Sequence, residues 1–494
     1  MPAARVRRAS SGSGDVVAGS TPPAVVIAAP ASGSGKTTVA TGLIGALSAA
    51  GHRVAPFKVG PDYIDPGYHG LAAGRAGRNL DPNLVGEHRV APLFAAGAAG
   101  ADIAVVEGVM GLFDGRIADQ AAGDGAIGAG GAFGSTAQVA GLLGAPVILV
   151  VDAAGHSQSL AALLHGFLGF DTSVRIAGVI LNRVGSPRHE QVLRQACARV
   201  GLAVLGVLRR DPGLAVPSRH LGLIPAAERN TDAVRSVSEI SAKVGAALDL
   251  PAIIEVARSS RGPVVTPWSA ADEIAAVEEN AAGERPGSVA APLIAVAGGA
   301  AFTFSYAEHA ELLTAAGARV EVFDPLADPL PRGAHALVIG GGFPEEHGEQ
   351  LSGNAPLLSD LRAMAAAGRP IHAECAGLLY LLAALDDRPM AGVLAGSGAF
   401  SSRLTLGYRD AVALTDSPLF PAGSRVTGHE FHRTRVQWTD RPAPAWGWRD
   451  ADGRAHTEGT VHRGVHASYL HVHPAGYPEA VARFVRAARG PEAR

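Results

Sequence analysis

Short apolar runs alternate with longer helix-like segments along most of the chain. In the first half these runs are VVIAA (25–29), ADIAVVEG (101–108), PVILVVD (146–152) and IAGVILN (176–182). Continuous apolar runs of this length predict strands of a parallel sheet that helices cover on both faces. The alternation resumes with PLIAVAG (292–298), ARVEVF (318–323), HALVIGGG (335–342) and RPIHAEC (369–375). The pattern therefore predicts an α/β protein with two units, each built on a parallel sheet.

Changes in composition divide the chain into four parts. Residues 1–21 carry three arginines and a Ser/Gly-rich stretch without the apolar run of a secretion signal, so we expect a disordered tail. The first unit spans 22–250. Residues 251–290 contain SSRGP and ERPGS and predict a linker with one short helix, and 291–494 form the second unit. Inside the first unit, the Gly/Ala-rich segment 121–134 predicts a surface loop.

The charge balance and the cysteine content argue against several classes of protein for this sequence. The 494 residues include 42 basic and 45 acidic side chains, a net charge of −3, so a nucleic acid is not an expected partner. No apolar run reaches the roughly 18 residues of a membrane span. The two cysteines, Cys197 and Cys375, lie far apart in the sequence, which favours a cytoplasmic protein over a disulfide scaffold or a metal cluster. Cys197 falls in a helical pattern and is expected in the core.

The first candidate site is the segment APASGSGKTT (29–38), which follows a predicted strand and precedes a predicted helix. This context is typical of a phosphate-binding loop. The glycines let backbone N–H groups face phosphate oxygens, Lys36 neutralises the terminal phosphates, and the Thr37 hydroxyl can ligate Mg²⁺. Pro30 replaces the first glycine of the usual pattern. The residues expected to bind the nucleotide are Ser32, Gly33, Ser34, Gly35, Lys36, Thr37 and Thr38.

Acidic residues at other strand ends are candidate partners of this loop. Glu107 ends the strand AVVEG, where a second acidic ligand of Mg²⁺ is usual, and Asp114 follows in GVMGLFDG. Asn182 ends the strand GVILN, where it could read the nucleobase or simply cap a turn.

A further polar cluster follows the probable second strand, in FKVGPDYIDPGYH. It supplies Lys58, Asp62, Asp65 and His69. Taken alone, its Gly-Pro and Asp-Pro steps also suit an ordinary turn, so both interpretations remain open at this point.

The second candidate site is Cys375, which lies between a predicted strand and an apolar helix in PIHAECAGLLYLL. This position exposes a nucleophile at a helix N-terminus, and we expect it to lower the pKa of the thiol. The nearest candidate bases are His466, His471 and His473 in GVHASYLHVHP. Backbone N–H groups of Gly340–Gly342 could bind an oxyanion.

The combined motifs resemble the cobyrinic acid or hydrogenobyrinic acid a,c-diamide synthase family of glutamine-dependent corrinoid amidotransferases. The resemblance covers residues 24–480. It rests on APASGSGKTT, FKVGPDYIDP, RNLDPNL, EGVMGLFDG, GSTAQVA, GVILNRVGS, RDPGLAVPSRHLGL, GGGFPEEH, AECAGLLYL and SYLHVH. It implies an N-terminal P-loop NTPase-like domain, similar to dethiobiotin synthetase, and a C-terminal class I glutamine amidotransferase domain.

The resemblance also implies roles for individual residues. Lys36 and Thr37 would bind ATP and Mg²⁺, and Glu107 would support metal binding. Asp62, Tyr63, Asp65 and Asp114 would lie at the corrinoid substrate and its activation site, Asp114 also serving phosphoryl transfer. Cys375 would be the nucleophile and His471 its base. Ordinary class I glutaminases carry a Glu two residues after that histidine, but this chain has His473.

The implied reaction is ATP-dependent amidation of the a and c carboxylates of cobyrinic or hydrogenobyrinic acid, through an acyl phosphate, with nitrogen from glutamine or ammonia. A homodimer is a further expectation. Two alternatives remain: an adenosylcobyric acid synthase-like amidotransferase, and a nucleotide-switch ATPase acting on protein partners. Such ATPases usually carry an extra lysine early in the loop, where this chain has Pro30, Ala31 and Ser32.

Overall fold

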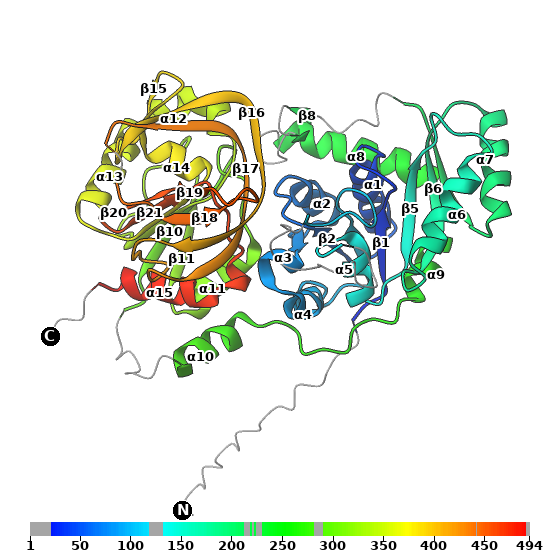
Figure 1. Ribbon diagram of the computed structural model, residues 1–494, viewed down its shortest axis with the longest axis horizontal. Coiled ribbons are helices and arrows are strands. Elements are labelled where there is room, and N and C mark those ends of the chain that lie inside the picture. Colours follow the sequence, from blue (N-terminus) through cyan, green and yellow to red (C-terminus); the bar gives the residue numbers. More distant parts are fainter. Residues whose placement is uncertain are drawn as a thin grey trace, which may run out of the picture.

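The chain folds into two α/β units that lie side by side in the computed structural model (Figure 1). The structure describes residues 21–117, 132–211, 218–219, 222–223, 230–280, 290–440 and 442–490. Nearly all of the predicted tail and most of the predicted loop 121–134 lie outside these residues. Within the described part of the chain, no helix is both long and apolar enough to cross a membrane.

The first unit contains a seven-stranded parallel sheet with the order β3-β2-β4-β1-β5-β6-β7. Its strands are β1 (Ala24–Ala28), β2 (Val54–Val59), β3 (Arg78–Leu80), β4 (Ile103–Glu107), β5 (Val147–Asp152), β6 (Ile176–Val184) and β7 (Val204–Arg209). Strands β1, β2 and β4 are buried along their whole length, as apolar runs covered on both faces must be. The predicted parallel sheet is confirmed.

Helices cover both faces of this sheet. They are α1 (Lys36–Ala49), α2 (Asp65–Ala73), α3 (Pro82–Val85), α4 (Glu87–Gly97), α5 (Thr136–Leu142), α6 (Leu160–Phe170), α7 (Pro187–Arg199), α8 (Asn230–Ala247) and α9 (Leu250–Arg258). Strand β8 (Ser218–Arg219) pairs antiparallel with β9 (Gly222–Leu223). Cys197, on α7, is buried as expected.

The first unit extends beyond the predicted boundary at residue 250. Helix α9 is capped by Asp249, whose side chain accepts a hydrogen bond from the Ala252 N–H, and Ile253 and Ala257 join the core of the first unit. The linker therefore begins after α9. Its predicted single helix is α10 (Ala270–Asn280), which packs against two helices of the second unit.

The second unit contains a six-stranded sheet with the order β11-β10-β12-β13-β21-β20, parallel except for its last pair. The strands are β10 (Leu293–Ala297), β11 (Arg319–Phe323), β12 (Ala336–Ile339), β13 (Ile371–Glu374), β20 (Thr460–His462) and β21 (Val465–Ser468). The helical segments are α11 (Ala307–Ala315), α12 (Gly348–Gly353), α13 (Ala355–Ala366), α14 (Ala376–Leu381), α15 (Pro478–Ala488) and the 3₁₀ turns Pro344–His347 and Pro474–Gly476.

A third, largely antiparallel sheet also belongs to the second unit, and the apolar pattern did not predict it. It comprises β14 (Leu382–Leu385), β15 (Arg388–Pro389), β16 (Leu394–Ala413), β17 (Arg425–Trp438), β18 (Trp446–Arg449) and β19 (Ala455–Glu458). The long β16–β17 hairpin faces the first unit (Figure 1). On β16, the Tyr408 hydroxyl donates to Asp81 across the interface at 2.9 Å, and Asp410 pairs with Arg116.

Candidate active sites

The phosphate-binding loop has the predicted strand-loop-helix context, between β1 and α1. Gly33 and Gly35 adopt φ values of 78° and 98°, a left-handed conformation that glycine adopts without strain. A side chain at Gly35 would also overlap the Asn182 amide, because a Cβ there would lie 2.3 Å from its Nδ2. The loop therefore needs its second glycine for both conformation and space.

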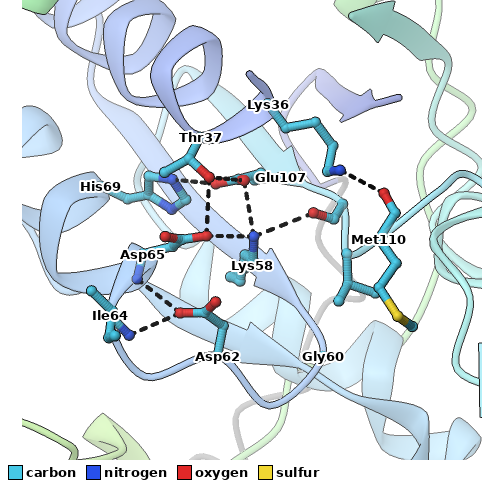
Figure 2. A network of polar contacts seen from close by, with 12 residues as sticks. Lys36, Thr37, Lys58, Gly60, Asp62, Ile64, Asp65, His69, Glu107 and Met110 are labelled. Atoms are coloured by element: carbon cyan, nitrogen blue, oxygen red, sulfur yellow. Dashed lines mark hydrogen bonds and ion pairs between the residues drawn. The ribbon is translucent and has the colours of Figure 1, made fainter. Parts of the chain in front are cut away.

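Parallel pairing brings the polar residues of three strands to one edge of the sheet. Ile27 on β1 and Lys58 on β2 both pair with Glu107 on β4, so the loop after β1 begins beside Lys58 and Glu107. The Thr37 hydroxyl lies 2.7 Å from Glu107 Oε1 and 3.2 Å from Asp65 Oδ2. Figure 2 shows these side chains pointing toward one another.

Lys58 lies at the centre of this network. Its Nζ donates to Asp65 Oδ2 at 2.6 Å and to Glu107 Oε1 at 2.9 Å, and all three side chains are buried (Figure 2). The second Glu107 oxygen lies 2.8 Å from His69 Nε2. Although burial opposes it, the charge of Lys58 holds the pKa of Glu107 well below its usual range. Burial, helped by Asp62, raises the pKa of Asp65 to about 7.

The donor set suits a magnesium ion. Two carboxylates and a hydroxyl, from Asp65, Glu107 and Thr37, converge at hydrogen-bond distances from one another. Oxygen ligands of this kind, completed by water and phosphate oxygens, are what Mg²⁺ prefers. In this structure the Lys58 ammonium supplies the positive charge between the two carboxylates. The residues therefore fit the predicted metal site, with Asp65 added to Thr37 and Glu107.

Three other predicted residues make local contacts. Asp62 Oδ1 accepts hydrogen bonds from the N–H groups of Ile64 and Asp65 at 2.8 and 2.9 Å, and so caps the start of α2 (Figure 2). Asp114 accepts one from Gly111 N–H at 2.8 Å within its own turn. Asn182 donates to the Ser34 carbonyl at 2.9 Å and thereby supports the phosphate loop. That Asp62 and Asp114 contact the substrate, and that Asn182 contacts the nucleobase, stay predictions.

We predict that the affinity for ATP depends on pH through the charge of Lys36. Burial and the nearby Lys58 charge lower the pKa of Lys36 to about 8, and its ammonium donates to the Met110 carbonyl. The charged form binds phosphates, so ATP binding above pH 8 must take up a proton. We expect the affinity for ATP to fall about tenfold per pH unit between pH 8 and 9.5.

Isothermal titration calorimetry from pH 7 to 9.5 measures this dependence. Lys36→Arg is the matched control, because a guanidinium stays charged over the whole range and its slope should vanish even if binding is weaker. An affinity of the unchanged protein that stays constant to pH 9.5 would contradict the role of Lys36.

The second site lies where β13 meets α14. Cys375 follows the last residue of β13 with φ 50° and ψ −100°, the strained turn expected of a nucleophile between strand and helix. Its N–H donates to the Ser468 carbonyl of the neighbouring β21 at 2.7 Å. Its Sγ lies 3.9 Å from the Phe431 carbonyl oxygen on β17.

The expected lowering of the Cys375 pKa is wrong. Burial raises the pKa of this thiol, and the charges of Glu345 and Glu374 raise it further. The six-residue helix α14 does not compensate for these effects. The resting cysteine is therefore a neutral thiol, and it must pass its proton to a base before it can react.

His471 lies beside Glu374, the residue that precedes Cys375, with its Nδ1 3.4 Å from Glu374 Oε2. Its main chain pairs in both directions with His429 on β17, with N···O distances of 2.9 Å. A Cβ on Gly341 would lie 2.6 Å from His471 Cε1, so the glycine loop contacts the ring closely. The ring of Tyr63, from the first unit, packs 4.6 Å from the imidazole centroid.

Tyr63 thus lies in the interface between the two units and not only within the first site. It is buried, stacks on Phe304, and shares a 3.0 Å hydrogen bond between its hydroxyl and that of Tyr306. The loop that carries Asp62 and Asp65 therefore extends to the histidine of the second site.

A cavity of about 600 Å³ lies between the two units. The first unit contributes Asp62, Tyr63, Asp65 and Arg116 to its walls, and the β16–β17 hairpin contributes Tyr408, Arg409, His429 and Phe431. Asp65 of the carboxylate cluster is among its lining residues. So is Phe431, whose carbonyl contacts Cys375.

Sequence reasoning missed the central roles of three residues. Lys58 and His69 were recognised only as members of a polar cluster, although a lysine in a chain with so few lysines was a usable signal. Glu374 was not singled out, yet its Oε2 lies 3.4 Å from His471 Nδ1. Its position next to the candidate nucleophile was the available clue.

Two family models match the chain and define its class. Residues 25–224 match the CobQ/CobB/MinD/ParA nucleotide binding domain, and residues 293–478 match the CobB/CobQ-like glutamine amidotransferase domain. Fold and site agree with these matches, since the phosphate loop lies in the first range and Cys375 and His471 in the second. The protein is a nucleotide-binding domain joined to a glutamine amidotransferase domain.

Full-length relatives identify the particular family. Hydrogenobyrinate a,c-diamide synthase of Mycobacterium tuberculosis (strain ATCC 25618 / H37Rv) is 59% identical over 462 residues, covering 94% of this chain and 97% of the relative. The protein of the same name from Streptomyces coelicolor is 55% identical, covering 95% and 98%. Cobyrinate a,c-diamide synthase of Gloeobacter violaceus is 42% identical, covering 94% and 96%. The chain belongs to this family of a,c-diamide synthases.

Proposed function

We propose that this chain converts the a and c carboxylates of hydrogenobyrinate to amides in cobalamin biosynthesis, with ATP as the activating substrate and glutamine as the nitrogen donor. The relatives above 50% identity carry the hydrogenobyrinate name, whereas the cobyrinate synthases compared are at 42% or below. This difference favours the metal-free acceptor. The same names favour a diamide synthase over an adenosylcobyric acid synthase, and the amidotransferase domain disfavours a nucleotide switch.

The cavity between the units carries the proposal. It borders the carboxylate cluster through Asp65 and the cysteine site through Phe431, so one bound acceptor can receive a phosphoryl group and then ammonia. Arg116 and Arg409 in its walls suit an acceptor with several carboxylates. Because the β16–β17 hairpin supplies about a third of the lining residues and the first unit the rest, both units bind the acceptor.

Activation occurs at the first site. The acceptor carboxylate oxygen attacks the γ-phosphorus of ATP, the bond to the bridging oxygen breaks, and ADP leaves an acyl phosphate on the acceptor. Lys36 and the loop N–H groups bind the phosphates, and the Lys58 ammonium adds a fixed positive charge between Asp65 and Glu107 at this site. When bound to Thr37, Asp65 and Glu107, Mg²⁺ would neutralise phosphate charge.

Ammonia is produced at the second site. Cys375 gives its proton to His471, and the thiolate attacks the side-chain carbonyl carbon of glutamine. The imidazolium returns the proton to the leaving nitrogen, which departs as ammonia and leaves a thioester. Water then hydrolyses the thioester to glutamate. Ammonia attacks the acyl phosphate, and inorganic phosphate leaves as the amide forms.

The remaining expectations concern the protein as a whole. Mg²⁺ is the proposed metal because the donor set consists of oxygen atoms. A cytoplasmic location and a homodimer stay predictions from the sequence.

Product analysis tests the proposed function. The purified chain is incubated with hydrogenobyrinate or cobyrinate, ATP, Mg²⁺ and glutamine, and mass spectrometry follows the conversion of carboxylates to amides. We expect two amides on hydrogenobyrinate and a lower kcat/KM with cobyrinate. Glutamine hydrolysis and ATP consumption without an amidated corrinoid would contradict the assignment.

Asp65→Asn is expected to raise the magnesium concentration needed for half-maximal amidation and to lower kcat about 100-fold, because the variant removes one of two carboxylates beside Thr37. Asp62→Asn is the matched control. Asparagine caps a helix as well as aspartate does, so α2 stays intact and the magnesium requirement should not change. An unchanged magnesium requirement in Asp65→Asn would remove Asp65 from the metal site.

A further inference from the structure

The carboxylate that usually orients the histidine of a class I glutaminase is missing from its expected position, which His473 occupies. Burial lowers the pKa of His473 to about 4, so this ring is neutral at physiological pH. Its Nδ1 accepts a hydrogen bond from Ala475 N–H, and the ring packs 4.0 Å from the ring of Tyr306. His473 therefore supplies neither a negative charge nor a contact to His471.

We propose that Glu374 takes over this role and positions His471 through its Nδ1 atom. This inference rests on the proposed roles of Cys375 as nucleophile and His471 as base. Glu374 Oε2 lies 3.4 Å from His471 Nδ1, and Oε1 lies 3.3 Å from the N–H of Val472. The carboxylate thus contacts both the ring of the histidine and the main chain that follows it.

The other contacts of Glu374 keep it charged and in place. Its Oε1 lies 3.2 Å from His372 Nε2, on the same strand. Although burial opposes it, contact with His372 and His471 holds the pKa of Glu374 well below its usual range. The carboxylate is therefore an anion at any pH at which the enzyme works.

The orientation of the ring follows from this contact. A carboxylate accepts from Nδ1–H, which leaves the lone pair of the imidazole on Nε2. His471 Nε2 is buried and has no hydrogen-bond partner among the described residues, so it is the ring nitrogen left to accept a proton. The negative charge of Glu374 then stabilises the imidazolium formed by that transfer.

The strand geometry explains how a residue beside the nucleophile can do this. Glu374 and Cys375 are consecutive at the end of β13, where the chain turns sharply, and β21 lies alongside with Glu374 paired to Ser468. His471 follows three residues later. The same strand end thus carries the nucleophile and the residue that orients its base.

Several titratable groups surround this pair and are part of its environment. They are His372 on β13, His309 on α11, His429 on β17, and Tyr63 and Tyr306 from the interface. Burial lowers the pKa of His309 to about 4 and that of His429 to about 3, and it raises the pKa of both tyrosines. Glu374 is the one anion in direct contact with the His471 ring in the described part of the chain.

Glu374→Gln tests the proposal, because glutamine keeps the shape and removes the charge. We expect kcat for glutamine hydrolysis to fall about 100-fold while KM for glutamine changes less than threefold. A fall in kcat with little change in KM distinguishes an orienting residue from a general structural defect, which would also weaken glutamine binding.

Two controls separate positioning from structure. His456→Gln changes an exposed histidine of the same unit, which contacts Asp450 and not Glu374, and should leave kcat unchanged. Amidation with ammonium in place of glutamine should stay at the parental rate in Glu374→Gln, which shows that the chain is folded. If Glu374→Gln does not fold, Glu374→Asp replaces it: the charge is retained but lies farther from the ring, so kcat falls about tenfold.

A double-mutant cycle with His471→Ala decides the outcome. If Glu374 acts through His471, Glu374→Gln adds no further loss in the His471→Ala background. A further 100-fold loss there, or a parental kcat in Glu374→Gln alone, would overturn the proposal. Full glutaminase activity in His471→Ala would instead overturn the assignment of the base, and this inference with it.

Discussion

Cys375→Ala is expected to lose amidation with glutamine completely while amidation with ammonium salts at alkaline pH continues. The thiol forms the only bond between enzyme and glutamine in the proposed mechanism, so no residual pathway remains at the second site. The acceptor is still phosphorylated at the first site, where Lys58, Asp65 and Glu107 form a separate network. Product formation with each nitrogen source, measured side by side, gives the result.

Cys197→Ala is the matched control for this variant. It removes the other cysteine, which is buried in the core of the first unit and distant in sequence from both sites. Glutamine-dependent amidation should be retained. If Cys375→Ala used glutamine as well as the parent, or lost ammonium-dependent activity while still folded, two separable sites would be the wrong description.

Lys36→Ala is expected to remove amidation with both nitrogen sources. The acyl phosphate must form before ammonia can react, and the lysine charge that meets the phosphates is lost. Removing one preorganised charge of this kind costs about 100-fold to 1,000-fold in kcat. Glutaminase activity without acceptor should survive, because Cys375 and His471 lie in the second unit.

Ammonium distinguishes the two variants. Neither Cys375→Ala nor Lys36→Ala should form amidated product with glutamine. With ammonium, Cys375→Ala should form product and Lys36→Ala should not. Substantial amidation by Lys36→Ala at saturating ATP would refute the phosphate-loop assignment.

The two parallel sheets and the phosphate loop could be predicted because their signals are local. Strands buried on both faces must be largely apolar, as β1 is throughout and β4 is up to Glu107, and the loop needs glycines at fixed positions beside Lys36. Cys375 was predictable for the same reason, since strand, turn and helix are contiguous in the sequence.

The antiparallel sheet could not be predicted in this way. Strand β16 is exposed at many positions and contains Gly396, Gly398 and Gly407, so neither an apolar run nor a strict alternation marks it. Its structure depends on pairing with β17 and on the first unit that it faces.

Contacts between units explain the remaining misses. The ring of Tyr63 meets His471 only because two domains dock, and nothing in the local sequence of either residue indicates it. The raised pKa of Cys375 likewise comes from burial and from carboxylates on neighbouring segments. The sequence indicates where Cys375 lies between strand and helix but not its electrostatic surroundings.

The shared cavity limits how the two units can evolve or be engineered. The β16–β17 hairpin belongs to the glutaminase unit, yet Tyr408 and Arg409 on it line the cavity between the two units, the proposed acceptor pocket. Exchanging this unit for one from another amidotransferase would therefore replace about a third of the proposed pocket's lining along with the ammonia source. A chimera that keeps the acceptor specificity of this protein would also need its β16–β17 hairpin, because residues of both units line the proposed acceptor pocket.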